Sequence, residues 1–182
     1  MIDWNFIRSL ENAHGVDALK GYVPNSGKSG VTIATGCDLG WITPRAMAQL
    51  PITLQAALKP YIGAVGQVAE AVLARAPLTI SEPDADAIDR VTFGDDTAAI
   101  SSAYTRDSGT SFLSLPDRAQ TVICSLAFQY GTNLARRTPR FWHFVCVRDW
   151  NETVDDLRHF GDAYDTRHNR EADYLAPLCG GH

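Results

Sequence analysis

The stretch "SGVTIATGCDLG", residues 29–40, decides how the rest of this chain is interpreted. Val31, Thr32 and Ile33 are consecutive apolar or β-branched residues, which predicts a short strand, and glycines before and after them act as turn signals. One acidic residue, Asp38, stands among small and apolar neighbours. An isolated carboxylate among apolar residues suggests a functional role, and the neighbouring segments indicate which one.

The segment just before this stretch has the composition of a β-hairpin. "GYVP" (21–24) and "VTIAT" (31–35) are the predicted strands, and "NSGKSG" (25–30) is the predicted turn between them, because Gly, Ser, Pro and β-branched residues dominate here. Asp38 is then expected on the turn that follows the last strand.

The remaining sequence favours helices. "IDWNFIRSLENAHG" carries apolar residues at helical spacing, with Asp3 as the expected N-cap. Thr43 followed by Pro44, and Ser81 followed by an acidic turn, mark two later helix starts. One helix, a small sheet and then many helices indicate an α+β protein with a minor β-lobe and a larger helical lobe. The later helices are expected near residues 52–59, 63–75, 81–92, 95–106, 116–130, 139–148, 150–160 and 167–175.

Composition and charge exclude several classes of protein. Apolar residues make up 45% and charged residues 20% of 182 residues, which is typical of a soluble globular protein. The formal net charge of -5 argues against a nucleic-acid binder, which usually carries a basic surface. No apolar run approaches the roughly 18 residues of a membrane span, so we expect no membrane insertion. "MIDWNFIRSL" lacks the features of a secretory signal, and delivery to another compartment would need a different route.

The cysteines and histidines suggest no metal or cofactor. The four cysteines contain no CxxC spacing, and the histidines show no metal-binding spacing. We expect mostly free thiols, because Cys124 and Cys146 lie in apolar helical sequence.

Two carboxylates and a hydroxyl form the candidate catalytic group. Glu11 lies at the end of the first helix, and Thr32 and Asp38 lie in the hairpin region. If the hairpin folds back on the end of the helix, the three side chains meet on one wall of a cleft. Glycoside hydrolysis needs such a pair, one carboxyl protonated and one ionised. The pair alone is a weak signal, because a glutamate at a helix end is commonly a solvated surface residue.

The wider pattern resembles the lysozyme-like domains of the pesticin type, bacterial toxin relatives of phage lysozyme. The resemblance rests on the helix that ends at Glu11, on "GYVP" and on "SGVTIATGCDLG", and it continues through "LTISEPDADAIDRVTFGDDTAAISSAY", "AQTVICSLAFQYG" and "RDWNETVDDLRHFGDAYDTRHNREADYL". It spans about residues 2–176. It implies a bilobed lysozyme-like fold in one domain (1–182), with a β-containing lobe at about 15–62 and a helical lobe at about 63–176 packed with the helix 1–14.

The same resemblance implies roles for particular residues. Glu11 corresponds to the general acid, Asp38 to the catalytic Asp of the Gly-x-Asp-Leu-Gly turn, and Thr32 to the threonine that positions the attacking water. Classical phage enzymes instead place the second carboxylate between the acid and the threonine, and Asp17 lies in roughly that region. Asp38 is favoured because its motif matches the pesticin-like pattern letter for letter.

Further residues are expected to contact the sugar chain. Phe128 and Gln129, at the end of the most apolar helix, correspond to cleft residues on the helical lobe, and Tyr22 is a candidate for the cleft wall. For Phe128 and Tyr22, simple core packing is the competing interpretation.

The implied activity is a peptidoglycan muramidase that cleaves the β-1,4 linkage between N-acetylmuramic acid and N-acetylglucosamine, with inversion. Such a protein would act in the periplasm of a target cell, as an antibacterial effector or as an endolysin, delivered by a secretion apparatus, a fusion partner or a holin. Its partners would be peptidoglycan and an immunity or inhibitor protein. The alternatives are an inactive wall-binding module and a surface that binds only proteins.

Overall fold

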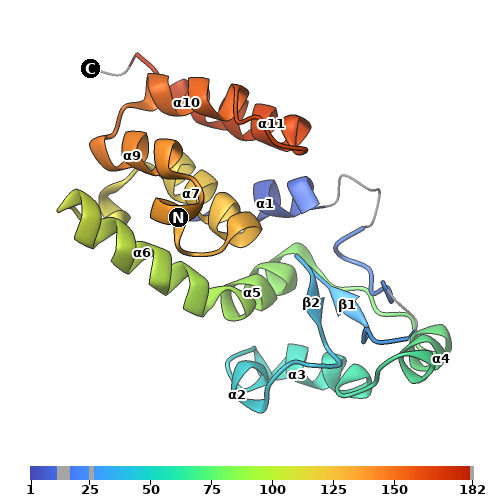
Figure 1. The fold of residues 1–182 in the computed structure, drawn as a ribbon. Helices are drawn as coiled ribbons and strands as arrows, with labels where there is room; N and C mark the ends of the chain where they lie inside the picture. The colour runs from blue at the N-terminus through green and yellow to red at the C-terminus, as the bar shows by residue number, and fades with distance from the viewer. Residues whose placement is uncertain (12–16, 25–26, 181–182) are drawn as a thin grey trace. The chain divides into compact units, whose positions relative to one another are not determined.

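The computed structural model describes residues 1–11, 17–24 and 27–180 of the chain, except for the side chain of Glu11 (Figure 1). The chain divides into two compact units. Residues 7–94 form one, called the sheet unit here, and residues 1–6 together with 95–182 form the other, called the helical unit. The division falls inside the first helix, α1 (Trp4–Glu11).

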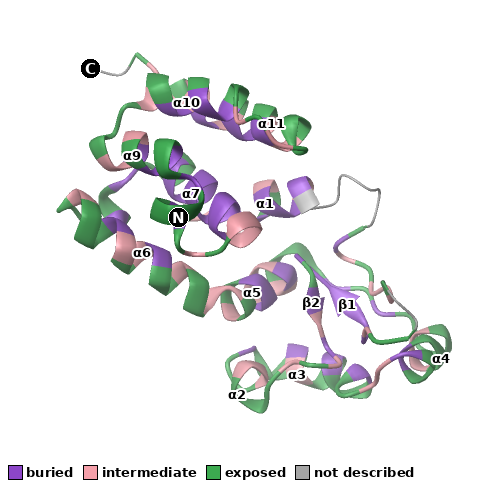
Figure 2. Cartoon of the chain, in the orientation of Figure 1, coloured by how far each residue is buried: buried purple, intermediate pink, exposed green. Residues whose placement is uncertain are grey.

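The helical unit is built around α7 (Asp117–Tyr130). Every residue from 119 to 127 on this helix is buried (Figure 2). A helix that is buried on all sides marks the centre of a core, which is what its uniformly apolar sequence predicts. The elements around α7 are α6 (Gly94–Ser108), η3 (Phe112–Ser114), α8 (Leu134–Arg137), α9 (Pro139–Val147), α10 (Trp150–Arg158), α11 (Asp165–Leu175) and η4 (Ala176–Leu178).

The sheet unit has its own core around two short strands, β1 (Thr32–Ile33) and β2 (Cys37–Asp38). Val31, Ile33 and Leu39 are fully buried there and belong to one apolar cluster with residues of the helices. Those helices are α2 (Pro44–Met47), α3 (Ile52–Leu58), η2 (Lys59–Tyr61), α4 (Gln67–Arg75) and α5 (Glu82–Thr92).

The strand pairing differs from the predicted hairpin. β1 pairs antiparallel with β2, with Thr32 opposite Asp38, and the expected pairing of 21–24 with 31–35 is reduced to a bridge between Tyr22 and Thr32. Asp38 therefore lies in a strand, and its predicted place in a turn is wrong. The reason is a tight turn over residues 34–36, in which Ala34 (φ 54°) and Gly36 (φ 89°) are left-handed and return the chain at once.

The helix starts follow the sequence closely. Asp3 accepts a hydrogen bond from the backbone N–H of Phe6 at 3.0 Å, and Thr43 caps α2 with Pro44 in its first turn. Ser81 and Asp84 form a reciprocal capping box at the start of α5. These caps confirm the three predicted starts.

Many helices with one small two-stranded antiparallel sheet confirm the α+β fold class. The boundaries between the compact units, at residues 6/7 and 94/95, differ from the predicted lobes at 15–62 and 63–176. Helices α4 and α5 fall in the sheet unit because their apolar residues join the cluster around the strands. That residues 1–182 form a single domain stays a prediction.

Candidate active site

Three of the predicted site residues form a row across the small sheet. Tyr22 and Thr32 exchange both backbone hydrogen bonds, with N···O distances of 3.0 and 2.7 Å. Asp38 is the partner of Thr32 on the other side. Because directly opposed residues of antiparallel strands project from the same face, the side chains of Tyr22, Thr32 and Asp38 share one face.

Thr32 and Asp38 form the closer kind of antiparallel pair. The flanking bond runs from the N–H of Leu39 to the carbonyl of Val31 at 2.9 Å, so the pair between them makes no backbone bond of its own. Such pairs bring the Cα atoms to about 4.5 Å and their side chains closer together than hydrogen-bonded pairs do. The predicted proximity of Thr32 and Asp38 therefore follows from the register of the sheet.

Backbone N–H groups hold the carboxylate of Asp38 in place. The N–H of Gly30 lies 3.0 and 3.1 Å from its two oxygens, and the N–H of Gly40 donates to Oδ1 at 2.8 Å. The side chain is half-buried. Asp38, the one acid of residues 29–40, is thus oriented by backbone groups of the same stretch.

Two glycines make this close approach possible. A Cβ at Gly30 would lie 2.3 Å from Asp38 Oδ1, and a Cβ at Gly40 would lie 2.8 Å from the carbonyl oxygen of Ala64. Both distances are far below van der Waals contact, so any side chain would displace the backbone or the carboxylate. Gly40 lies in a tight turn that the N–H of Trp41 closes on the carbonyl of Asp38 at 3.1 Å, and it also leaves space for Ala64. Gly36 is the left-handed glycine.

The hydroxyl of Thr32 is held only weakly. Its Oγ1 donates to the carbonyl of Gly30 at 3.4 Å, which is long for a hydroxyl hydrogen bond. Thr32 is buried, with 4% of its surface exposed. A hydroxyl in this state has acceptor capacity for one further polar group beside Asp38.

Glu11 is the last residue of α1, and its side chain lies outside the described part of the chain. Its role as general acid stays a prediction. The turn that precedes it is well anchored, because Arg8 is buried and donates to Asp89 on α5 at 2.8 Å. Arg8 also contacts Glu82 and Asp86, each at 2.8 Å.

The same Asp89 holds the β1–β2 turn. Its Oδ1 accepts the N–H of Thr35 at 2.9 Å and its Oδ2 accepts the Thr35 hydroxyl at 2.8 Å. Asp89 is fully buried, and burial raises the pKa of its carboxyl, while the bonds from Thr35 and Arg8 act in the opposite direction. Sequence reasoning missed this cluster of Arg8, Asp89 and Thr35. The available signal was an arginine and three acids at positions 82, 86 and 89, spaced to share one face of a helix.

Asp17, the alternative second carboxylate, is bound locally. It accepts the N–H of Leu19 at 3.0 Å and pairs with Lys20 at 3.2 Å, and these two contacts lower the pKa of its carboxyl. The side chain is exposed. Both partners lie within three residues, which is the pattern of an Asx-type turn.

The predicted sugar-binding residues Phe128 and Gln129 belong to the helical unit, whereas the row of Tyr22, Thr32 and Asp38 belongs to the sheet unit. Phe128 is half-buried and stacks on Trp4, with ring centroids 5.9 Å apart and planes 8° apart. Gln129 is also half-buried. One face of the Phe128 ring is therefore occupied by packing against Trp4.

A second buried polar network, also missed from the sequence, lies between α7 and α11. Glu171 is fully buried and bonds to Ser125 at 2.5 Å, to His168 at 2.8 Å and to Arg167 at 3.2 Å. His168 further bonds to the Tyr130 hydroxyl at 2.8 Å. Arginine, histidine and glutamate at positions 167, 168 and 171 are the only local sign of it, because the serine and tyrosine come from another helix.

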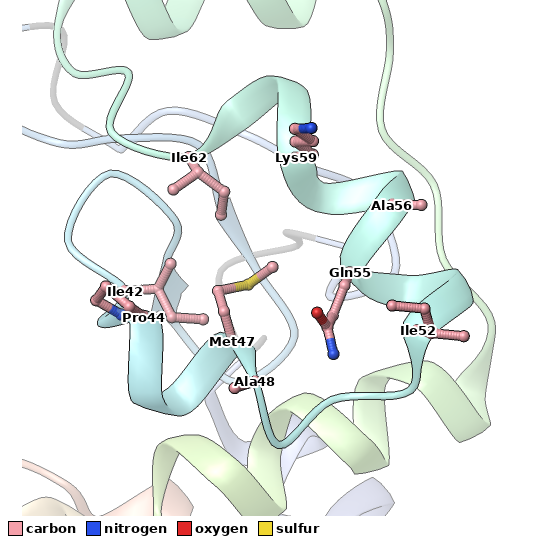
Figure 3. A pocket seen from close by; sticks show the side chains of 9 residues that line it. All are labelled: Ile42, Pro44, Met47, Ala48, Ile52, Gln55, Ala56, Lys59 and Ile62. Carbon is pink, nitrogen blue, oxygen red and sulfur yellow. The ribbon is translucent and has the colours of Figure 1, made fainter.

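An open cavity of about 590 Å³ lies in the sheet unit between α2 and α3 (Figure 3). Its lining is mostly aliphatic, with Lys59 as the single charged residue and no carboxylate. It therefore lacks the groups for acid–base chemistry. The lining residues are Ile42, Pro44, Met47, Ala48, Ile52, Gln55, Ala56, Lys59 and Ile62.

Among the described residues, no helix is both long and apolar enough to cross a membrane, and no group of three or more acidic, histidine or cysteine side chains is placed to hold a metal ion. All four cysteines are free thiols, as expected.

Comparison with known proteins agrees with the α+β lysozyme-like fold class. A search of curated proteins finds no match to the chain. A protein-family model described as "Pesticin: Bacterial toxin homologue of phage lysozyme, C-term" matches residues 1–151. The match includes α1 and both strands and ends at the start of α10. Because it covers most of the sequence, the chain belongs to the pesticin family of bacterial toxin homologues of phage lysozyme.

Proposed function

We propose that this protein is a peptidoglycan muramidase that cleaves the β-1,4 linkage between N-acetylmuramic acid and N-acetylglucosamine. The observation that carries the proposal is the pair of Thr32 and Asp38 on one face of the sheet, with the Asp38 carboxylate fixed by two backbone N–H groups. Membership of a lysozyme-like toxin family supports the choice of substrate.

The proposed reaction is a single displacement with inversion. Glu11 donates its proton to the glycosidic oxygen, and the bond from that oxygen to the anomeric carbon breaks. A water held by Asp38 and Thr32 attacks the anomeric carbon from the opposite face, and Asp38 accepts its proton. This geometry needs about 6.5–9.5 Å between the two carboxyl groups, which leaves room for the water.

The remaining predicted residues supply binding. Tyr22 shares the face of Thr32 and Asp38, so its ring can contact the sugar next to the scissile bond. Phe128 and Gln129, which are half-buried on the helical unit, are kept as proposed glycan-binding residues.

The proposed setting is that of an antibacterial toxin or an endolysin. The protein would act on the wall in the periplasm of a target cell after delivery by a secretion apparatus, a fusion partner or a holin. An immunity protein would protect the producing cell. The competing function is a lysozyme-like module that binds the wall or a protein without cleaving. A carboxylate fixed by backbone N–H groups beside a weakly bonded threonine supports catalysis over it.

Digestion of purified peptidoglycan tests the proposal. Wild type, Glu11→Gln and Asp38→Asn are compared, with Asp17→Asn as the matched control and circular dichroism as the check on folding. We expect muropeptides with reducing-end muramic acid from wild type and from Asp17→Asn only. Proton NMR of the first products would show the α-anomer if the reaction inverts.

Two results would overturn the proposal. If folded wild type binds the wall and releases no muropeptides, the binding-module alternative replaces catalysis. If Asp38→Asn stays active while Asp17→Asn is inactive, the second carboxylate is Asp17, and the backbone cradle around Asp38 is structural.

A further inference from the structure

We propose that Asp89 is a positioning residue that fixes the end of α1, which carries Glu11, relative to the strand pair that carries Thr32 and Asp38. The expected effect on kcat rests on the proposed function. The positioning itself is a structural property of the sheet unit and can be tested without activity.

Asp89 is placed to connect three elements. It lies on α5 and none of its surface is exposed. Its two oxygens accept three hydrogen bonds, two from Thr35 and one from Arg8, at 2.8–2.9 Å. A fully buried carboxylate whose partners come from a helix and a strand turn holds both in a defined direction, because hydrogen bonds weaken steeply with misalignment.

On the helix side, the connection reaches the last turn of α1. Arg8 precedes Glu11 by three residues, which is about 4.5 Å along a helix axis. The side chain of Arg8 is 4% exposed, and its guanidinium binds Glu82 and Asp86 in addition to Asp89. A planar donor group with three carboxylate partners on one face of α5 has little freedom to shift, so the backbone that carries Glu11 follows α5.

On the strand side, Thr35 lies midway between the two residues of the catalytic pair. It is three residues after Thr32 and three before Asp38, inside the turn that contains the left-handed Ala34. A non-glycine residue in that conformation persists only where its surroundings hold it. The turn sets the register of β1 and β2, so the two hydrogen bonds that Thr35 donates to Asp89 hold the Thr32–Asp38 pair in place.

A purely structural role makes a different prediction. Removing a buried group that serves stability alone weakens the whole unit and leaves the turnover of the remaining folded molecules unchanged. Removing a positioning contact lowers kcat in molecules that are still folded, since misplacement by about 1 Å can cost a hundredfold in rate.

Thr35→Val is the central variant, because it removes one hydroxyl and keeps size, branching and the backbone N–H. Thr35→Ser, which retains the hydroxyl, is the rescue. Thr53→Val is the matched control, because it makes the same substitution at an exposed position on α3. We expect Thr35→Val to lower kcat on labelled soluble peptidoglycan by about tenfold to a hundredfold with little change in KM. Thr35→Ser and Thr53→Val should stay within about threefold of wild type in kcat, because each keeps both hydrogen bonds between Asp89 and Thr35.

Amide hydrogen exchange measured by NMR tests the positioning without any activity. The N–H groups of Gly30 and Gly40, which bind Asp38, should exchange faster in Thr35→Val, while the amides of α7 in the helical unit should not change. This result would support the inference even if wild type cleaves no peptidoglycan. Unchanged exchange at Gly30 and Gly40, or a uniform increase over all amides, would overturn it.

Discussion

His168→Phe should destabilise the helical unit by about 3 kcal/mol at pH 6, because breaking a buried ion pair from one side costs about 3–5 kcal/mol. The His168 and Glu171 side chains are 1% and 0% exposed, and Nδ1 of the ring lies 2.8 Å from the glutamate. Phenylalanine fills the ring volume, so no large cavity adds to the loss. Arg167 and Ser125 still bind the other glutamate oxygen, which places the cost at the lower end of that range.

The loss should depend on pH in a defined direction. Burial alone would lower the pKa of His168, but the bonds and attraction from Glu171 and then Asp162 outweigh it and raise the pKa above 6.5. A raised folded-state pKa means that the stabilisation is complete below the unfolded pKa, near 6.5, and is lost as the pH rises through the folded value. The difference between wild type and variant should therefore shrink from pH 6 to pH 9, by at most about 1.4 kcal/mol per pH unit.

The other charged groups around the ring do not produce the same trend. Arg167 keeps its charge throughout this range. Tyr130 bonds to both Asp162 and His168, and burial followed by its bond to Asp162 raises the pKa of its hydroxyl above the range tested. The pKa of the Asp162 carboxyl is lowered, because its bonds from Tyr130, Tyr164 and His168 outweigh the effect of burial, so it titrates below this range.

Guanidinium denaturation followed by circular dichroism, at pH values from 6 to 9, measures the free energy of unfolding. Hydrogen exchange of α7 and α11 assigns the change to the helical unit. Arg158→Gln is the control, because its ion pair with Asp173 at 2.6 Å is exposed and should contribute less than about 1 kcal/mol. A His168→Phe effect below 1 kcal/mol at pH 6, or one that grows with pH, would refute the reasoning.

Three further changes test the packing of single residues. Gly30→Ala should abolish wall cleavage, because its Cβ would meet Asp38 Oδ1 at 2.3 Å, whereas Gly94→Ala, with open space around it, should leave digestion of purified peptidoglycan unchanged. Leu126→Ala should lower the free energy of unfolding by about 2–5 kcal/mol in chemical denaturation, since the side chain is fully buried in α7. The thiol of Cys124 should stay unreactive toward an aromatic disulfide reagent at pH 8 until the protein unfolds, because burial raises its pKa to about 12; rapid labelling of the folded protein would contradict this.

What the sequence predicted correctly depends on neighbours in the chain. The caps at Asp3, Thr43 and Ser81 each act within three residues, so their chemistry is visible locally. The proximity of Thr32 and Asp38 was predictable for the same reason, because only five residues separate them and the glycines between and around them permit a tight turn.

What it missed depends on the fold. The predicted strand pairing was wrong because the observed pairing requires Ala34 to adopt a left-handed conformation. Alanine rarely adopts this conformation, so residue propensities do not predict it. Arg8 and Asp89 are 81 residues apart, and an arginine on a short amphipathic helix looks solvated until α5 packs against it. Long-range partners of buried charges are set by packing, which a single sequence does not display.

These contacts also explain why Asp38 suits the proposed chemistry better than Asp17. A carboxylate that holds a catalytic water has to stand still while the water is consumed and replaced, and preorganised positions are what active sites require. Asp17 is oriented by an exposed lysine and one N–H of its own turn, and solvent competes for both. Asp38 is oriented by two N–H groups, one from Gly30 and one from Gly40, and these glycines leave no space for rearrangement. The turn before its strand is bound through Thr35 to the buried Asp89. In the proposed mechanism the strand pair would therefore provide a fixed base, held in place by the hydrogen bonds between Thr35 and the buried Asp89.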